Sequence, residues 1–196
     1  MTTMIRNSVM SLLLFTILTG LIYPLAVTGI AQLAFPHQAN GSIITNNGKA
    51  LGSELIGQEF NSPKYFWGRL SATVPYPYNS GASSGSNLGP NNPDLVKTAQ
   101  ARIDALHAVD PGNHAKIPVD LVTASASGLD PHISIAAAEY QLGRVAKARG
   151  LDEPAVRQLI AAQTKGRWLG LFGEPAVNVL ALNLSLDKQK SSEEAK

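Results

Sequence analysis

The residues best suited to acid–base chemistry are Asp130 and His132, which are separated only by Pro131. A carboxylate can fix the tautomer of a histidine, and that histidine can then act as a general acid or base. Residues this close in the chain seldom point at each other, however, and no nucleophile pattern accompanies the pair. We therefore expect Asp130 to cap the helix that follows and His132 to form local hydrogen bonds.

Two histidines and a glycine-rich loop are the other candidates for chemistry. His107 and His114 lack the His or Glu partners at i+4 that a metal site needs, so we expect solvated surface side chains. The loop 80–90 offers many backbone amides but contains no Lys and follows no clear strand, which favours a structural loop over a phosphate site. The sequence thus predicts no catalytic, cofactor-binding or metal-ligating residue.

Composition restricts the classes of partner and of site. The chain has 196 residues, enough for one domain and a membrane segment, and a formal net charge of +2. Of the 16 Lys and Arg, all but Arg6, that is 15, lie from Pro36 onward. The same part of the sequence contains all 14 Asp and Glu, so its charges nearly balance. No basic surface for nucleic acid is implied. The absence of cysteine excludes thiol nucleophiles, zinc–cysteine sites and disulfides.

An apolar segment at the N-terminus predicts a membrane-spanning helix. Residues 9–35 include no charge over 27 positions, whereas a bilayer core of ~30 Å requires only about 20 helical residues. Arg6 precedes the segment and Lys49 is the next basic residue after it, so the positive-inside rule places the N-terminus in the cytoplasm. Most of the chain is then expected outside the cytoplasm.

A cleaved signal peptide is the alternative interpretation of this segment, with Gly29 and Ala31 as small residues at a cleavage site. The apolar run continues through residues 33–35, beyond the usual length of a signal peptide, and this favours a retained anchor.

One face of the predicted anchor is smaller and more polar than the rest, which suits contact between helices in lipid. Its residues follow i, i+3, i+4, i+7 spacing, although such residues are also tolerated in a solitary anchor. Pro24 is expected to kink the helix. The candidate helix–helix interface comprises Thr16, Thr19, Gly20 and Tyr23.

The part of the chain after the anchor reads as one α/β or α+β domain. Three helices are predicted from capping signals, and two short strands from alternating apolar residues. The helices begin at Asn92-Pro93, Ser134 and Asp152, and the strands cover Val119–Thr123 and the stretch from Val177 to Asn183. Ile43 and Ile44 suggest either a first strand or a tether.

Two further segments lack helical or strand periodicity. Residues 61–92 are rich in Pro, Gly, Ser, Asn and Tyr, and a loop of this length is functional, disordered or pinned by its own aromatic residues. The charged tail is expected to be disordered. The predicted organisation is a cytoplasmic N-terminus (1–8), a transmembrane helix (9–35), an extracytoplasmic domain (36–187) and a disordered tail (188–196).

A series of short motifs then runs in order along the chain. They are Leu55–Gln58, Tyr65–Phe66, Arg69, Ser71–Ala72, Tyr78–Asn79, Ser86–Pro90, Asn92–Pro93, Pro118–Asp120, Val122–Ser125, Ser127–Ser134, Arg144–Ala146, Gly173–Pro175, Asn178–Leu180 and Leu182–Asn183. Together they closely resemble the C subunit of the Kdp potassium-transporting P-type ATPase of bacteria, over almost the whole chain. Small departures occur at Leu70, Ser84 and Ile135, where the family usually has proline, glycine and proline.

The resemblance implies a non-catalytic accessory and assembly subunit of an ATP-driven potassium uptake complex in the bacterial inner membrane. Its partners would be a channel-like potassium-binding subunit, an ATP-hydrolysing pump subunit and a small fourth subunit. ATP is the only cofactor implied, because the C subunit has been proposed to raise the ATP affinity of the pump subunit. The candidate motif surface comprises Ser86, Asn87, Asp130 and His132.

The predicted orientation conflicts with direct ATP contact, because ATP is cytoplasmic and the domain is expected in the periplasm. An effect on ATP affinity would then be a coupling through the complex. The alternative function is a membrane-tethered extracytoplasmic hydrolase that uses Asp130 and His132. A solitary lipid-anchored binding module is disfavoured, because the chain has no cysteine to lipidate.

Overall fold

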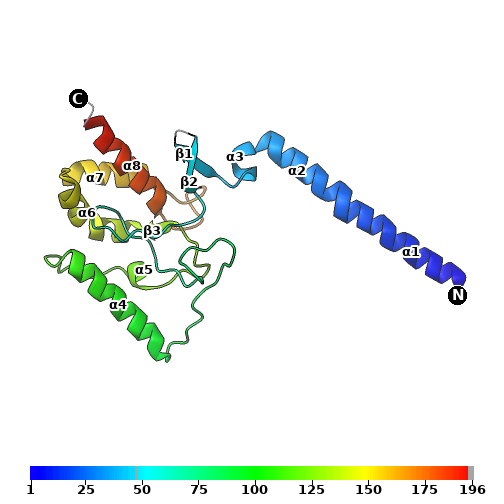
Figure 1. The fold of residues 1–196 in the computed structure, drawn as a ribbon, viewed down its shortest axis with the longest axis horizontal. Helices are drawn as coiled ribbons and strands as arrows, with labels where there is room; N and C mark the ends of the chain where they lie inside the picture. Colours follow the sequence, from blue (N-terminus) through cyan, green and yellow to red (C-terminus); the bar gives the residue numbers. More distant parts are fainter. Residues whose placement is uncertain (47, 194–196) are drawn as a thin grey trace. The chain divides into compact units, whose positions relative to one another are not determined.

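The structure is a computed structural model, and it describes residues 1–46 and 48–193. The chain divides into two compact units, Met1–Leu51 and Gly52–Lys196. The first unit carries the apolar helix, and the second carries the mixed helix and strand domain (Figure 1). The predicted fold class, an α/β or α+β domain preceded by one N-terminal apolar helix, is confirmed.

The N-terminal helix is a continuous run of three helical elements. They are α1 (Thr2–Ile17), the π-helical turn η1 (Leu18–Ile22) and α2 (Tyr23–Ala34). The run Thr2–Ala34 has 33 residues, a mean hydropathy of 2.1 in its most apolar stretch and no buried side chain. At 1.5 Å per residue it is longer than the ~30 Å hydrocarbon core, so by length and composition it could cross a membrane.

A π-helical turn interrupts this helix just before Pro24. The N–H of Tyr23 donates to the carbonyl of Leu18, five residues earlier, and the hydroxyl of Thr19 donates to the carbonyl of Phe15 at 2.6 Å. Such a turn adds about one residue to the helical repeat, so positions after it are rotated by about 100° from a uniform α-helix. Tyr23 therefore does not continue the face of Thr16 as the predicted spacing assumed.

The rest of the first unit is short. The helical turn α3 (Pro36–Ala39) is followed by the strand β1 (Ile43–Asn46), which pairs with β2 (Lys49–Ser53), a strand that continues past Leu51 into the second unit. Ile43 and Ile44 therefore belong to a strand, which was one of the two predicted alternatives.

The second unit contains five helices among its described residues. They are α4 (Pro93–Val109), α5 (Val119–Val122), α6 (Ile135–Arg149), α7 (Glu153–Ala162) and α8 (Val179–Glu193). Helix α7 packs against both α6 and α8, while α5 packs against α4 (Figure 1). The three predicted helix starts are confirmed within one residue.

The capping residues explain why these helices begin and end where they do. The Asn92 side chain accepts the N–H of Asp94 at the start of α4, and the Ser134 hydroxyl accepts the N–H of Ala137 at the start of α6. Gly150 ends α6 in the left-handed conformation, with φ of 67°, which glycine adopts without strain.

A small antiparallel sheet lies beside these helices. Its order is β3 (His132–Ser134), β5 (Ala176–Asn178) and β4 (Thr164–Lys165). In the register, Ile133 and Thr164 both pair with the central Val177, which is fully buried. The sheet thus brings the motif around His132 next to the start of α8.

The segment Val119–Thr123 forms a helical turn, not the predicted strand. In a strand Val119 and Leu121 would share a face, whereas Leu121 is fully buried and Val119 is 71% exposed. The hydroxyl of Thr123 donates to the carbonyl of Val119 at 2.9 Å and closes the turn. Local hydrogen bonding of this kind competes with strand formation.

The second predicted strand is shorter than expected. Only residues 176–178 are extended, because the Asn178 side chain accepts the N–H of Ala181 at 3.0 Å and begins α8. Helix α8 then continues to Glu193, so residues 188–193 are helical where the sequence predicted a disordered tail. Extending a formed helix through Lys, Gln and Glu costs little. Residues 194–196 of that tail lie outside the described residues.

The core fills the space between the helices, the sheet and the long loop. Its largest members are apolar side chains from α4 to α8 together with two aromatic residues of the loop. The buried cluster includes Phe66, Trp67, Leu106, Leu121, Ile133, Leu142, Val145, Val156, Ile160, Val177, Leu182 and Leu186.

Two buried amide side chains hold the loop segment Phe66–Trp67 in the core. Asn183 of α8 accepts the N–H of Phe66 at 2.9 Å and donates to its carbonyl at 3.0 Å. Gln141 of α6 does the same for Trp67, at 2.8 and 3.1 Å. These pairs satisfy backbone groups that have no sheet partner, and an unpaired buried group would cost roughly 1–3 kcal/mol. We call this arrangement the amide clamp.

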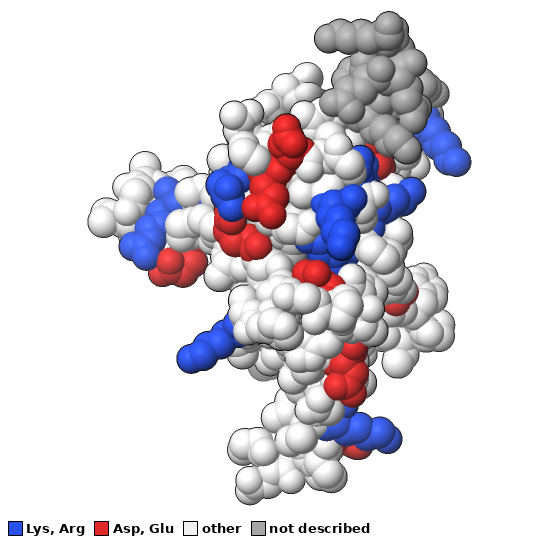
Figure 2. Space-filling view, turned by 90° about the vertical axis from the view of Figure 1, so that its left-hand side faces the viewer, with Lys and Arg blue, Asp and Glu red and all other residues white. Residues whose placement is uncertain are grey.

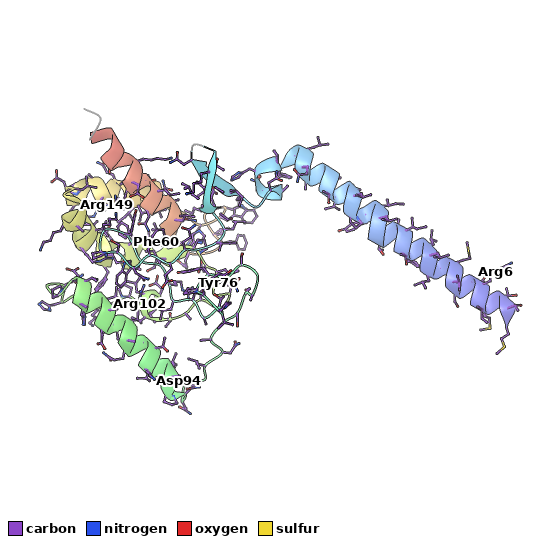
Figure 3. All side chains as sticks on the ribbon, viewed as in Figure 1. Arg6, Phe60, Tyr76, Asp94, Arg102 and Arg149 are labelled. Atoms are coloured by element: carbon purple, nitrogen blue, oxygen red, sulfur yellow. The ribbon has the colours of Figure 1, made fainter. Side chains whose placement is uncertain are left out.

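Three arginines secure the same loop. Arg102 donates to the carbonyl of Gly68, Arg144 to that of Pro63 and Arg149 to that of Lys64. The guanidinium groups of Arg102 and Arg144 lie 4.7 and 5.1 Å from the centre of the Trp67 ring. Burial lowers the pKa of Arg144 to about 10. Arg102 on α4 and Arg149 on α6 are labelled in Figure 3. The loop is therefore pinned, as one of the predicted alternatives had it.

Candidate functional site

Asp130 and His132 are in contact, contrary to the expectation for residues so close in sequence. One carboxylate oxygen of Asp130 accepts the backbone N–H of His132 at 3.0 Å and lies 3.2 Å from its Nδ1 atom. This is an Asx turn, in which an aspartate bonds to the backbone two residues on, and it brings the imidazole over the carboxylate. Asp130 therefore does not cap α6, since Ser134 performs that role.

Arg69 completes this cluster from the long loop. Its guanidinium donates to the second oxygen of Asp130 at 3.1 Å and to the carbonyl of Ala124 at 3.2 Å. The side chains of Arg69, Asp130 and His132 are between 27% and 31% exposed, so each is partly buried and partly accessible to solvent. We call these three residues the Arg69 cluster.

The electrostatics of the Arg69 cluster favour the ionised form of Asp130. Partial burial alone would raise its pKa, but the hydrogen bonds from the side chain and backbone of His132, its charge and the bond from Arg69 outweigh that cost. The pKa of Asp130 is therefore lowered. A carboxylate so well satisfied is suited to fixing neighbouring groups and poorly suited to giving up a proton near neutral pH.

The backbone around Arg69 is fixed by the neighbouring loop. The Tyr78 hydroxyl donates to the carbonyl of Arg69 at 2.6 Å, and burial raises the pKa of Tyr78 to about 12. A Cβ atom on Gly57 or Gly68 would approach the Tyr78 side chain to within 3 Å, so both positions require glycine. Leu70, one of the departures from the family pattern, forms an isolated parallel β-bridge with Ala124.

The cluster borders an open groove of about 440 Å³, whose lining includes Asp120 and Ser134. Ser134 lines this groove, and its hydroxyl is of the type that can act as a nucleophile. That hydroxyl, however, donates to Asp120 at 3.1 Å and accepts the N–H of Ala137. Asp120 also accepts the N–H of Ser134 at 2.7 Å. The serine is thus engaged in starting α6, and its recorded partners do not include His132.

The four residues of the candidate motif surface fall into two groups. Asp130 and His132 are joined, while Ser86 and Asn87 are exposed on the glycine-rich loop and do not line the groove. That loop is ordered by the N–H of Ser84, which donates to the carbonyl of Ser127 at 3.0 Å. The structural interpretation of the loop therefore has direct support.

Two further histidines, His107 and His114, were predicted to be surface side chains. His107 and His114 are exposed and line a shallow groove between the end of α4 and the residues after it. Over residues 1–46 and 48–193, no group of three or more His, Asp or Glu side chains is placed to hold a metal ion.

Charges on the surface are mixed in sign. Figure 2 shows Lys and Arg interspersed with Asp and Glu on the face that it presents, without a large patch of one sign. This agrees with the near balance of 16 basic and 14 acidic residues in the sequence. This face therefore lacks the large basic patch that binding of a polyanion such as nucleic acid would require.

Sequence reasoning missed the residues that organise the site. Arg69 and Asn183 occur in the short motifs without a predicted role, and Gln141 lies outside those motifs. Glu139 pairs with Arg157, and the guanidinium of Arg144 lies 5.1 Å from the centre of the Trp67 ring. A polar residue within an otherwise apolar helical face, such as Gln141 in α6, is the signal that could have revealed them.

Fold and site together define a class of protein. It is a small mixed domain preceded by a single apolar helix that could span a bilayer, with a charged cluster whose recorded contacts are internal.

Comparison with known proteins identifies the family. The family model described as KdpC, K⁺-transporting ATPase, c chain, matches residues 5–188. Proteins named potassium-transporting ATPase KdpC subunit are 61% identical in Herpetosiphon aurantiacus, covering 97% of this chain and 99% of the relative, and 60% identical in Polaromonas naphthalenivorans, covering 97% of each. The corresponding protein of Methylococcus capsulatus is 59% identical over 93% of this chain and 96% of the relative. The chain belongs to the KdpC family of K⁺-transporting ATPase subunits.

The lowered pKa of Asp130 predicts an acid-dependent loss of stability. A depressed folded-state pKa contributes stability above the unfolded value near 4, and this contribution disappears as pH falls through the folded pKa. We expect the denaturation midpoint of the full chain in detergent to fall more steeply below pH 4 for the wild type than for Asp130→Asn. Asp94→Asn, on the exposed start of α4, serves as the control. Parallel curves for wild type and Asp130→Asn would contradict the assignment.

Proposed function

We propose that this chain is a non-catalytic accessory and assembly subunit of an ATP-driven potassium uptake complex. The observation that carries the proposal is the family match over residues 5–188, which includes both the apolar helix and the domain. The relatives are named as subunits of a potassium-transporting ATPase and are matched over nearly their whole length. Arg69 and His132 both bond to Asp130, and this sharing of the carboxylate supports a role without chemistry of its own.

The proposed orientation follows from the charges that flank the apolar helix. Arg6, near the end of the helix in Figure 3, precedes the apolar stretch, and Lys49 is the next basic residue after it. The positive-inside rule then favours a cytoplasmic N-terminus and a domain on the periplasmic side of the bacterial inner membrane.

The partners would be the channel-like potassium-binding subunit, the ATP-hydrolysing pump subunit and the small fourth subunit. We assign helix contact to Thr16, Thr19 and Gly20, where small side chains let another helix approach closely. Tyr23 is a weaker member of this set, because the π-helical turn rotates it away from Thr16. The hydroxyl of Thr19 is bonded within the helix, so packing and not interhelical hydrogen bonding would drive the contact.

With the domain outside, this subunit would act on ATP affinity through coupling. A subunit that binds the ATP-competent state of the pump more tightly than its other states raises apparent ATP affinity without touching the nucleotide. The coupling is reciprocal, so ATP would also tighten binding of this subunit to the pump.

The alternative, a membrane-tethered hydrolase, has one favourable observation. His132 contacts Asp130 beside an open groove, which is the arrangement that orients a catalytic base. Against it, Asp130 is shared with Arg69, and Ser134 is engaged in capping α6.

Introduced cysteines test the orientation, since the chain has none of its own. We expect Lys116→Cys, at an exposed position of the domain, to react with an impermeant maleimide in cells whose outer membrane alone has been opened. Asn7→Cys should react only after the inner membrane is permeabilised. The opposite pattern would place the domain beside cytoplasmic ATP and contradict the proposed topology.

Two glycine substitutions test the assembly surface of the helix. A Cβ atom on Gly20 or Gly29 would meet nothing within 4 Å in this chain, so the chain itself does not crowd a side chain at the Cβ of either position. We expect Gly20→Leu to lower co-purification of the pump and channel-like subunits by about tenfold, the equivalent of roughly 1.4 kcal/mol of packing. Gly29→Leu is the matched control.

Two outcomes of this experiment would contradict the proposal. Equal recovery with both variants would contradict the assignment of Gly20 to the interface. A wild-type chain that purifies alone, without any pump or channel-like subunit, would contradict the accessory role. That second result would favour the hydrolase alternative.

A further inference from the structure

The loop between β4 and β5 exposes an apolar tip that the proposed function does not use. Trp168, Leu169, Leu171 and Phe172 are 70%, 72%, 76% and 60% exposed. Scattered single apolar residues on a surface need no explanation, but four large ones on one short turn form a contiguous patch. Such a patch indicates a surface that is covered in the working protein.

This tip is an ordered structure. The N–H of Trp168 donates to the carbonyl of Phe172 at 2.8 Å, and the N–H of Phe172 donates back at 3.0 Å. The two rings pack with centroids 5.7 Å apart, and Leu169 and Gly170 make the turn with positive φ. Leu169 thus adopts a strained conformation that keeps its side chain in solvent. Insertion of the tip elsewhere would require little further ordering.

The flanking residues resemble those of interfacial membrane anchors. Arg167 donates to both carboxylate oxygens of Glu174 at 2.9 Å and closes the base of the loop. Lys165, also exposed, precedes it on β4. Tryptophan is enriched at the membrane–water interface, and basic residues beside an apolar tip can remain at the level of the headgroups.

A bilayer lies within reach because the same chain carries a helix that could span it. Only residues 35–51, which include α3 and the paired strands β1 and β2, separate that helix from the second unit, so the domain cannot move far from the bilayer. A tethered domain meets the membrane at high effective concentration, so a weak individual insertion suffices. Such a contact requires the helix to span the membrane, but it depends neither on the orientation of the helix nor on any subunit role.

We propose that residues 168–172 insert shallowly into the interface of the bilayer in which the chain is anchored. The apolar tip then leaves water, while Lys165 and the Arg167–Glu174 pair stay among the headgroups. The domain is thereby held against the membrane by a second contact in addition to its helix.

The two tryptophans of the chain provide the test. Trp67 is only 4% exposed within the core, whereas Trp168 is 70% exposed at the tip. We would reconstitute the full chain alone into phosphatidylcholine vesicles with brominated acyl chains, which quench tryptophans in the bilayer. We expect Trp168 emission to fall about twofold or more relative to non-brominated vesicles, and the aqueous quencher acrylamide to lose access to it.

Variants assign the signal. Trp168→Phe should remove the quenched component, leaving the unquenched emission of Trp67. Leu171→Asp should restore acrylamide access and abolish lipid quenching, because a charge at the tip opposes insertion. Val96→Asp, at a position of α4 that is 67% exposed, is the matched control and should leave quenching unchanged.

Two results would overturn the proposal. Trp168 that stays open to acrylamide and unquenched by brominated lipid would show a tip in water. Trp168 that is shielded only in the assembled potassium-transporting complex, still without lipid quenching, would assign the tip to a protein partner. Neither result bears on the accessory role, which is judged by co-purification.

Discussion

The amide clamp is the interaction on which the second unit depends. Asn183 and Gln141 act as surrogate strand partners for Phe66 and Trp67, across separations of 117 and 74 residues. A loop without regular structure cannot normally enter a core, because its backbone groups would lose water without gaining partners. Here each amide supplies one donor and one acceptor, as a neighbouring strand would. Burial of the Phe66 and Trp67 rings follows from that satisfaction.

The amide clamp also determines where the Arg69 cluster lies. Trp67 is fixed by Gln141 and lies near the guanidinium groups of Arg102 and Arg144, and Gly68 is held by Arg102. Arg69 follows directly and meets Asp130, whose carboxylate orients His132. The buried amides therefore fix the loop, the loop places Arg69, and Arg69 holds Asp130 beside the groove. In this arrangement the carboxylate of Asp130 is shared between Arg69 and His132.

What could be predicted from the sequence was local in origin. The starts of α4, α6 and α7 were predictable because Asn92, Ser134 and Asp152 stand directly before their helices. The strand predicted at Val119 failed because alternation over five residues cannot distinguish a strand from one helical turn. The partners of Asp130 could not be found, since Arg69 lies 61 residues away and only the folded loop brings it near. The motif series indicated the family, but it predicted no structural role for Arg69 or Asn183.

Amide hydrogen exchange at Phe66 and Trp67 measures whether the amide clamp holds this loop in the core. In the full chain, we expect these two loop amides to exchange as slowly as those of the buried turns of α6, about 100-fold or more slower than the amides of the exposed residues Ser86 and Asn87. Asn183→Ala should accelerate exchange at Phe66, because its N–H loses its only recorded acceptor. Rates at Phe66 and Trp67 as fast as those of the exposed loop would contradict the account.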